Sequence, residues 1–100
     1  MRVEIVPMRA LDIEEVANIE QACFPDAWIS DFFAEELKSK HTRYFLAKAG
    51  LTTVGYIGIL YVLDEAQINK IAVAPAARRQ GVAKALLQKA ERFCREKKMI

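Results

Sequence analysis

The sequence predicts an α/β (α+β) domain in which a mostly antiparallel, mixed sheet is flanked by helices. Three features support this prediction. Segments 43–49 and 53–63 are rich in β-branched, aromatic and aliphatic residues and are joined across Gly50, as in a hairpin. Two segments with helical periodicity precede this hairpin, and a longer one follows Gly81. The expected order of elements is therefore β-α-α-β-β-β-α.

The first part of the chain predicts a short strand followed by a helix. Residues 2–6 alternate apolar and polar side chains before Pro7, a pattern that is typical of an edge strand. Asp12 and Glu15 have the spacing of a capping box, so we expect the first helix to begin there. Phe24-Pro25 should end this helix, because a residue before proline disfavours the helical conformation.

The remaining elements follow from caps and periodicity. Ser30 is expected to cap a second helix that runs to Lys38. After the hairpin, residues 67–74 are expected to add another antiparallel strand, and residues 81–97 form the last helix. The apolar face of that helix should consist of Val82, Leu86, Ala90, Phe93 and Cys94. Met99-Ile100 would begin a further strand.

Composition predicts a single domain over residues 1–100. The chain has 100 residues, 53% of them hydrophobic, which is enough for a small core. It contains no apolar run long enough to span a membrane and no signal-peptide segment, so we expect a cytoplasmic protein without membrane contact. Cys23 and Cys94 lack Cys or His neighbours at metal-ligand spacing, which favours reduced, partly buried thiols over a zinc site.

Charge is distributed unevenly along the chain. Residues 1–75 carry 7 basic and 11 acidic side chains, a net charge of −4, whereas residues 76–100 carry 8 and 2, a net charge of +6. A basic block of this kind suits a coenzyme's phosphates, a solvated helix face or nucleic acid. We rank nucleic acid last, because Phe93 is the aromatic residue among the basic ones and is expected to be buried.

The junction between the predicted strand 67–74 and the last helix is the candidate site. Gly81 lies where the helix begins, so first-turn N–H groups and the helix dipole can face an anion. Arg78, Arg79 and Lys84 add the positive charge that a pyrophosphate requires, which indicates a phosphorylated cofactor. The alternative is an ordinary strand–loop–helix connection without a ligand, since neither the Rossmann nor the P-loop glycine pattern is present.

The same turn carries a family resemblance. Arg78-Arg79-Gln80-Gly81-Val82-Ala83 is similar to the R/Q-x-x-G-x-G/A signature of the GNAT N-acetyltransferase superfamily. Further stretches match the ribosomal-protein-alanine N-acetyltransferase branch: Phe24-Pro25, Trp28-Ile29-Ser30, Val54-Gly55-Tyr56, Asp64-Glu65-Ala66, Ile71-Ala72-Val73-Ala74-Pro75 and Ala85-Leu86-Leu87. The resemblance covers nearly the whole chain. Because the family's domain continues with more strands and a helix, this chain is expected to be a C-terminally incomplete GNAT domain.

The resemblance implies acetyl-CoA as co-substrate. It implies that the backbone of Ile71, Ala72 and Val73 binds the pantetheine arm as if it were an added strand. The pyrophosphate would be wrapped by Arg79, Gln80, Gly81, Val82, Ala83 and Lys84. The side chains of Ile71 and Val73 are expected to be core residues in either interpretation.

The resemblance also implies an acceptor, namely a peptide or protein N-terminus, with the N-terminal alanine of a ribosomal protein preferred. Phe24, Pro25 and Trp28 would form its wall. The alternative for these residues is a hydrophobic staple between two helices. Tyr56 would either line the same groove or pack in the sheet.

No catalytic residue is assigned from the sequence. By resemblance, the family's acid and base lie beyond residue 100. Glu65 is the best internal substitute, but a surface or substrate-orienting role is favoured for it. His41 lies in a polar connection and is expected to be solvent-exposed.

Three hypotheses follow from these observations. The first is an acetyl-CoA-dependent N-acetyltransferase that modifies an amine. The second is a catalytically inactive, truncated GNAT module that binds coenzyme A or self-associates as a homodimer through its exposed sheet edge. The third is a basic nucleic-acid-binding module.

Overall fold

The computed structural model describes residues 1–97 of the chain. Its elements are β1 (Glu4–Pro7), the 3-10 helix η1 (Ala10–Asp12), α1 (Ile13–Cys23), α2 (Ser30–Lys38), β2 (Thr42–Ala49), β3 (Thr52–Val62), β4 (Glu65–Val73), the 3-10 helix η2 (Pro75–Ala77) and α3 (Val82–Glu96). The predicted order β-α-α-β-β-β-α is confirmed, with two short 3-10 helices added. The strand predicted at Met99 lies outside the described residues. None of the helices in this part of the chain is long and apolar enough to cross a membrane.

The four strands form one sheet in the order β1-β2-β3-β4, so each strand pairs with its neighbours in the sequence. Every described pairing is antiparallel, where the sequence predicted a mostly antiparallel mixed sheet. The turn between β2 and β3 contains Gly50, whose φ of +63° lies in the left-handed region that glycine adopts without strain. β1 forms one edge, as predicted, and β4 forms the other edge within residues 1–97.

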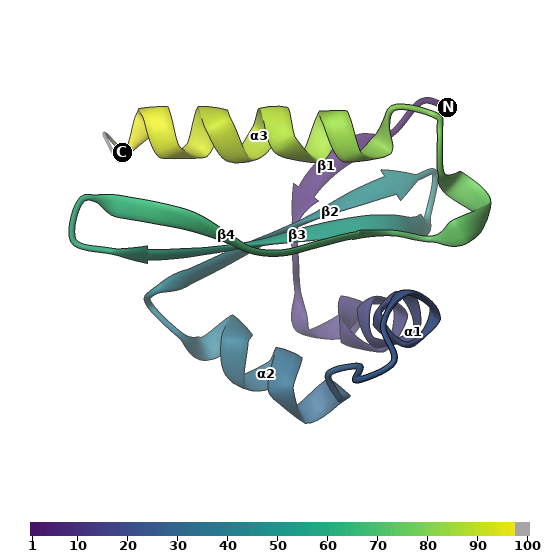
Figure 1. The fold of residues 1–100 in the computed structure, drawn as a ribbon, viewed down its shortest axis with the longest axis horizontal. Coiled ribbons are helices and arrows are strands. Elements are labelled where there is room, and N and C mark those ends of the chain that lie inside the picture. The colour runs from purple at the N-terminus through teal and green to yellow at the C-terminus, as the bar shows by residue number, and fades with distance from the viewer. Residues whose placement is uncertain (98–100) are drawn as a thin grey trace.

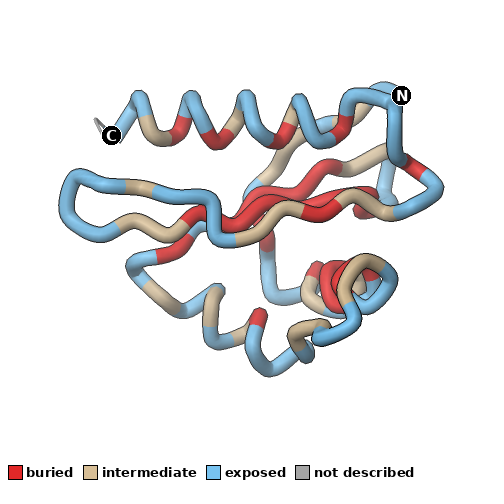
Figure 2. Tube along the Cα trace, viewed as in Figure 1, coloured by how far each residue is buried: buried red, intermediate tan, exposed pale blue. Residues whose placement is uncertain are grey.

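Helices cover both faces of this sheet (Figure 1). α3 lies along one face, and α1 and α2 lie against the other. Because side chains alternate along a strand, β2 and β3 contribute to a separate core on each face. The core under α3 includes Phe45, Ile57, Leu86 and Phe93, and the core under α1 and α2 includes Val16, Phe33, Leu46 and Tyr56. Buried residues therefore concentrate at the middle of the sheet and on the inner sides of the helices (Figure 2).

Gly55 in β3 lets the first turns of α3 pack closely on the sheet. A Cβ atom at Gly55 would lie 3.0 Å from the carbonyl oxygen of Ala72 and 3.1 Å from Cγ1 of Val82. The predicted apolar face of α3 is confirmed, because Val82, Leu86, Ala90 and Phe93 are all buried. The start of α3 is thus held beside the end of β4.

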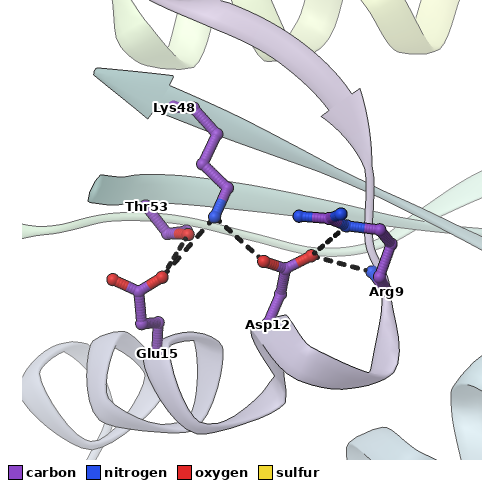
Figure 3. Close-up of polar contacts among 5 residues, drawn as sticks. All are labelled: Arg9, Asp12, Glu15, Lys48 and Thr53. Carbon is purple, nitrogen blue, oxygen red and sulfur yellow. Dashed lines mark hydrogen bonds and ion pairs between the residues drawn. The ribbon is translucent and has the colours of Figure 1, made fainter. Parts of the chain in front are cut away.

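The predicted capping box of Asp12 and Glu15 is wrong. The fully buried Asp12 side chain accepts hydrogen bonds from the Arg9 N–H and from Lys48 Nζ, both at 2.9 Å (Figure 3). Glu15 accepts a hydrogen bond from the hydroxyl of Thr53 at 3.0 Å and pairs with Lys48 at 3.5 Å. α1 begins without a side-chain cap, because a charged partner from the sheet holds Asp12 instead.

Ser30 does not cap α2, which corrects a second prediction. The cap is Ile29, in extended backbone conformation, and its carbonyl accepts the first helical hydrogen bonds. The carboxylate of Glu20 accepts the N–H of Trp28 at 3.0 Å and thereby fixes the extended segment before the helix. The chain therefore enters the helix with Ser30 already as its first residue, and the predicted span to Lys38 is confirmed.

Candidate functional site

The strand residues predicted to hold a cofactor lie at the end of β4, on an edge with which no described strand pairs. Ala74 donates its N–H to the carbonyl of Val54 at 2.8 Å, which orients the backbone of Ala72 toward β3 as well. By the alternation of an antiparallel pair, the N–H and C=O groups of Ile71 and Val73 point away from the sheet. Their side chains pack against the core under α3, as predicted. Only their backbone is therefore available at the edge.

Two side chains from other segments contact this edge. The carbonyl of Val73 accepts hydrogen bonds from the thiol of Cys23 at 3.4 Å and from Nε of Arg78 at 3.2 Å. Arg78 also donates to the sulfur of Cys23 at 3.3 Å. A groove of about 370 Å³ runs along the edge and is lined by Cys23, Phe24, Ile71, Ala72, Val73, Arg78 and Ala83. The end of α1, the edge of β4 and the start of α3 thus meet at one groove.

The loop before α3 has an unusual backbone. Arg79 has a φ of +62° and Gly81 a φ of +83°, both in the left-handed region. The N–H of Ala85 donates to the carbonyl of Gly81 at 3.1 Å as the first hydrogen bond of α3, so the N–H groups of residues 82–84 have no partner within the helix. A Cβ atom at Gly81 would meet nothing within 4 Å. The backbone conformation therefore favours glycine at position 81, and the space beside it is open to a ligand.

The residues predicted to wrap a pyrophosphate differ in what they can offer. Val82 is buried in the core under α3 and can contribute only its backbone. The others are exposed around the turn: Arg79, Gln80, Gly81, Ala83 and Lys84. Together with exposed Arg78, they place positive charge beside the N–H groups of the first helical turn. This arrangement fits a diphosphate group.

Phe24, Pro25 and Trp28 lie together between α1 and α2. Phe24 and Trp28 are half-buried and pack against the core under these helices, while Pro25 is exposed. The centroid of the Trp28 ring lies 4.3 Å from that of Phe32. These contacts are the ones expected of a hydrophobic staple. The ring faces of Phe24 and Trp28 lie against the ammonium group of Lys70 from β4.

Of the two alternatives for Tyr56, the structure shows packing in the sheet. Tyr56 is fully buried, and its hydroxyl donates a hydrogen bond to the carboxylate of Glu20. Burial and this hydrogen bond to a carboxylate both raise the pKa of Tyr56 above its ordinary value of 10. Any contribution of Tyr56 to acceptor binding would therefore run through Glu20.

Glu20 and Lys70 form a buried charged pair beside the groove, which the sequence analysis missed. Lys70 Nζ lies 2.5 Å from Oε2 of Glu20, whose side chain is 0% exposed. The same nitrogen lies 4.1 Å from the ring centroid of Phe24 and 3.9 Å from that of Trp28. Burial by itself raises the pKa of Glu20, but hydrogen bonds from Lys70, Tyr56 and the Trp28 N–H outweigh it, and the pKa falls below 4.5.

A β-bulge in β4 brings Lys70 to this position. Ile68 and Lys70 pair with consecutive residues of β3, so Asn69 is the extra residue of the bulge. Neighbouring side chains therefore reach the same face, where Asn69 donates to Glu36 at 3.1 Å and Lys70 to Glu20. The signal in the sequence is the pair of consecutive polar residues, Asn69-Lys70, between the apolar residues Ile68 and Ile71 of the strand.

The other polar candidates lie outside the groove. His41 is exposed, as predicted. Glu65 is exposed at the opposite end of β4, roughly 26 Å from Val73 at the usual rise of a strand. Cys23 and Cys94 are free, half-buried thiols, as predicted. Within residues 1–97, no group of three His, Cys, Asp or Glu side chains could hold a metal ion.

Comparisons with known proteins agree with this geometry. Residues 13–100 match the family described as the acetyltransferase (GNAT) family. A Bacillus subtilis protein, provisionally named a ribosomal protein bS18-alanine N-acetyltransferase, is 36% identical over 91 residues, which are 90% of this chain and 60% of that protein. The N-alpha-acetyltransferase RimI of Mycobacterium tuberculosis is 32% identical over 99 residues, which are 93% of this chain and 63% of that protein.

A solved structure shares the fold. The ribosomal-protein-S18-alanine N-acetyltransferase of Escherichia coli superposes with a TM-score of 0.87 at 25% identity, covering 96% of this chain and 61% of that one. The chain thus spans 60% to 63% of the length of the curated relatives described above. Its match to the family model extends over most of its length and includes β4, the glycine turn and α3. The chain therefore belongs to the GNAT acetyltransferase family.

Proposed function

We propose that this chain is part of an N-acetyltransferase and binds acetyl-CoA, whose acetyl group is transferred to an amine. The acceptor we propose is the N-terminal alanine of a ribosomal protein, in line with the names of two relatives. The observation that carries the proposal is that the outward-facing backbone of β4 and the start of α3, at Ala83 just after the left-handed Gly81, line one groove. We further propose that residues 1–100 belong to one GNAT domain and that the protein acts in the cytoplasm.

The two halves of the cofactor site suit the two ends of coenzyme A. The pantetheine arm carries amide groups, which can hydrogen-bond to the outward N–H and C=O groups of Ile71 and Val73 as an added strand would. A pyrophosphate can accept the N–H groups of residues 82–84 and pair with Arg79 and Lys84. The carbonyl of Val73 already accepts from Cys23 and Arg78, so one of these donors would have to release it for a ligand to use it.

The chemistry of acetyl transfer assigns a role to the strand edge. The amine nitrogen forms a bond to the thioester carbon and loses a proton to a base, the carbon–sulfur bond breaks, and the thiolate leaves. Negative charge develops on the carbonyl oxygen meanwhile, and a backbone N–H stabilises it best when it is fixed in place beforehand. We propose the outward N–H of Val73 for this role. The general base and acid are assigned to no residue of this chain.

The turn at Gly81 can be tested with a matched control. Gly81→Ala should lower the melting temperature, because a left-handed φ costs a residue with a Cβ about 1–2 kcal/mol. It should also reduce the rise in melting temperature that coenzyme A produces, since the backbone donors of the turn would move. Gly50→Ala has the same open surroundings and a similar φ but lies in the β2–β3 turn. It should lower the melting temperature and leave the response to coenzyme A intact.

The measurement is a thermal melt of each variant with and without coenzyme A. A saturating ligand adds about 2.7 kcal/mol at 100 times its dissociation constant, which a melt resolves easily. If the wild-type melting temperature does not change with coenzyme A, the proposed cofactor site is refuted. If Gly50→Ala and Gly81→Ala respond equally, the turn is not part of that site.

We also propose a second candidate, in which the chain self-associates through β4. The edge of β4 is nine residues long, and no other strand pairs with it within residues 1–97. Exposed edges of this kind can pair with a second chain. We propose no direct nucleic-acid partner.

A further inference from the structure

The ammonium group of Lys70 lies in a small cage. On one side it donates to the carboxylate of Glu20 at 2.5 Å, and on two others it faces the rings of Phe24 and Trp28 at 4.1 and 3.9 Å. Carboxylates and aromatic faces are the groups that proteins use to recognise cationic nitrogen. Within residues 1–97, this is the one ammonium group that lies over two aromatic rings.

A second lysine shows that neutralising a buried carboxylate does not require such a cage. Lys48 pairs with the buried Asp12 at 2.9 Å and is 12% exposed, against 17% for Lys70. Its partners are the carboxylates of Asp12 and Glu15 (Figure 3), and no aromatic ring lies against its ammonium group in the described structure. The aromatic rings around Lys70 are therefore not needed to neutralise the charge of Glu20.

The cage is held in place without the help of Lys70. The backbone N–H of Trp28 donates to Oε2 of Glu20, and the buried hydroxyl of Tyr56 donates to Oε1. The carboxylate would thus keep its orientation if Lys70 withdrew. Phe24 also lines the groove along β4, so the cage shares this ring with the site proposed for acetyl transfer.

We propose that Glu20, Phe24 and Trp28 form a binding site for a primary ammonium group, which Lys70 fills in this structure and which the N-terminal ammonium of the acceptor enters when Lys70 withdraws. Lys70 can withdraw because it has a long, flexible side chain on an edge strand. The acceptor's ammonium would replace its charge beside Glu20, so the carboxylate stays neutralised. That this amine is the acceptor's N-terminus rests on the proposed function. That the site binds an ammonium group rests on the contacts of Lys70 with Glu20, Phe24 and Trp28.

Removing Lys70 should expose the site to ligands. The probe is a short peptide with a free N-terminal alanine, compared with the same peptide N-acetylated, and binding is measured by calorimetry without coenzyme A. Lys70→Ala should bind the free-amine peptide about fivefold tighter than the wild type, a factor that corresponds to ~1 kcal/mol. The acetylated peptide should show no gain, and n-propylammonium, which replaces the deleted part of the lysine, should displace the free peptide.

Lys48→Ala is the matched control, because it deletes a lysine that is also mostly buried against a carboxylate but lies in β2, two strands away from β4. It should bind the peptide as the wild type does. Glu20→Gln added to Lys70→Ala should abolish the gain. If Lys70→Ala folds only when n-propylammonium is present, that rescue supports the site. If it does not fold at all, Lys70→Gln, which keeps a donor to Glu20 but no charge, should give the same gain.

Equal binding of the free peptide by the wild type and the Lys70 variant would overturn the proposal. So would a gain that extends to the acetylated peptide or to Lys48→Ala. These outcomes are separate from failure of the proposed function. The melts of the Gly81 variants with coenzyme A report on the cofactor site and do not involve Lys70, and peptide binding is measured without the cofactor.

Discussion

Asp12 and Glu20 are fully buried carboxylates, and each is neutralised by a lysine from the sheet. Asp12 ties the start of α1 to β2, and Glu20 ties the segment between α1 and α2 to β4 through Lys70 and the Trp28 N–H. Removing one partner of such a pair leaves an uncompensated buried charge, which costs more than the pair contributes. Single residues therefore fix how the helices sit on the sheet.

Asp12 should make stability depend on pH. Burial by itself raises the pKa of Asp12, but hydrogen bonds from Lys48 and the Arg9 N–H, with the charges of both residues, lower it below 3.8. Since the unfolded chain then takes up a proton first, ionised Asp12 stabilises the fold fully above about pH 5 and loses this effect as the pH falls through the folded pKa.

Asp12→Asn should therefore lower the free energy of unfolding by about 1–3 kcal/mol at neutral pH and weaken its decline in acid. Urea unfolding at a series of pH values measures both effects. Asp31→Asn, at an exposed position in α2, is the control and should keep the decline of the wild type. An unchanged acid decline in Asp12→Asn would contradict the assignment.

At the scale of elements, the two glycines of β3 allow helices and side chains to approach the sheet from opposite faces. Gly55 makes room for the start of α3, and Gly58 makes room for the ring of Tyr44 under α2. Tyr44 is buried, and its hydroxyl donates to Glu36 at 2.7 Å, so the ring cannot move aside freely. The packing of α3 and Tyr44 against the sheet thus depends on where the glycines of β3 lie in its register, as well as on its apolar side chains.

Gly58→Ala should be strongly destabilising. Its Cβ would lie 2.6 Å from ring atoms of Tyr44, a contact that forces the buried ring or the strand to shift. We expect the free energy of unfolding to fall by about 1–3 kcal/mol, measured by chemical denaturation. Combining it with Tyr44→Ala should cost less than the sum of the two single changes, because the second change removes the clash. Full additivity would show that the clash is not the cause.

At the scale of the whole molecule, two helical layers cover the faces of the sheet, and its β4 edge remains unpaired within residues 1–97. Arg78, Arg79 and Lys84 lie just before and at the start of α3, and Arg78 lines the groove, whereas residues 1–75 carry a net negative charge. The molecule therefore offers an unpaired strand and a positively charged helix start at one end of the sheet.

Self-association through β4 should depend on concentration. Light scattering over a wide concentration range would report the mass, which should rise toward that of a dimer. Ile68→Lys places a charge on the exposed part of β4 and should suppress pairing. Leu51→Lys makes the same change at an exposed residue of the β2–β3 turn and should leave it unchanged. A constant monomer mass would contradict this second proposal.

Local pattern was sufficient for much of the fold. Strand alternation, the proline at Phe24-Pro25 and the apolar face of α3 are properties of neighbouring residues, and each element predicted within residues 1–97 forms. The turn at Gly81 was likewise predictable, because a left-handed residue before a helix favours glycine. These features are determined by the sequence itself, since backbone sterics and side-chain periodicity act over a few residues.

Tertiary structure decided the polar contacts. Asp12 and Ser30 had plausible capping roles. Asp12 instead pairs with Lys48, 36 positions away in the sequence. α2 begins after Ile29, where Glu20 holds the N–H of Trp28. The Lys70 cage joins residues 50 positions apart and depends on the bulge at Asn69. The sequence pattern alone could not predict these contacts. A buried charge must be paired, but which residue pairs with it depends on how the helices and strands pack and on the register of the sheet.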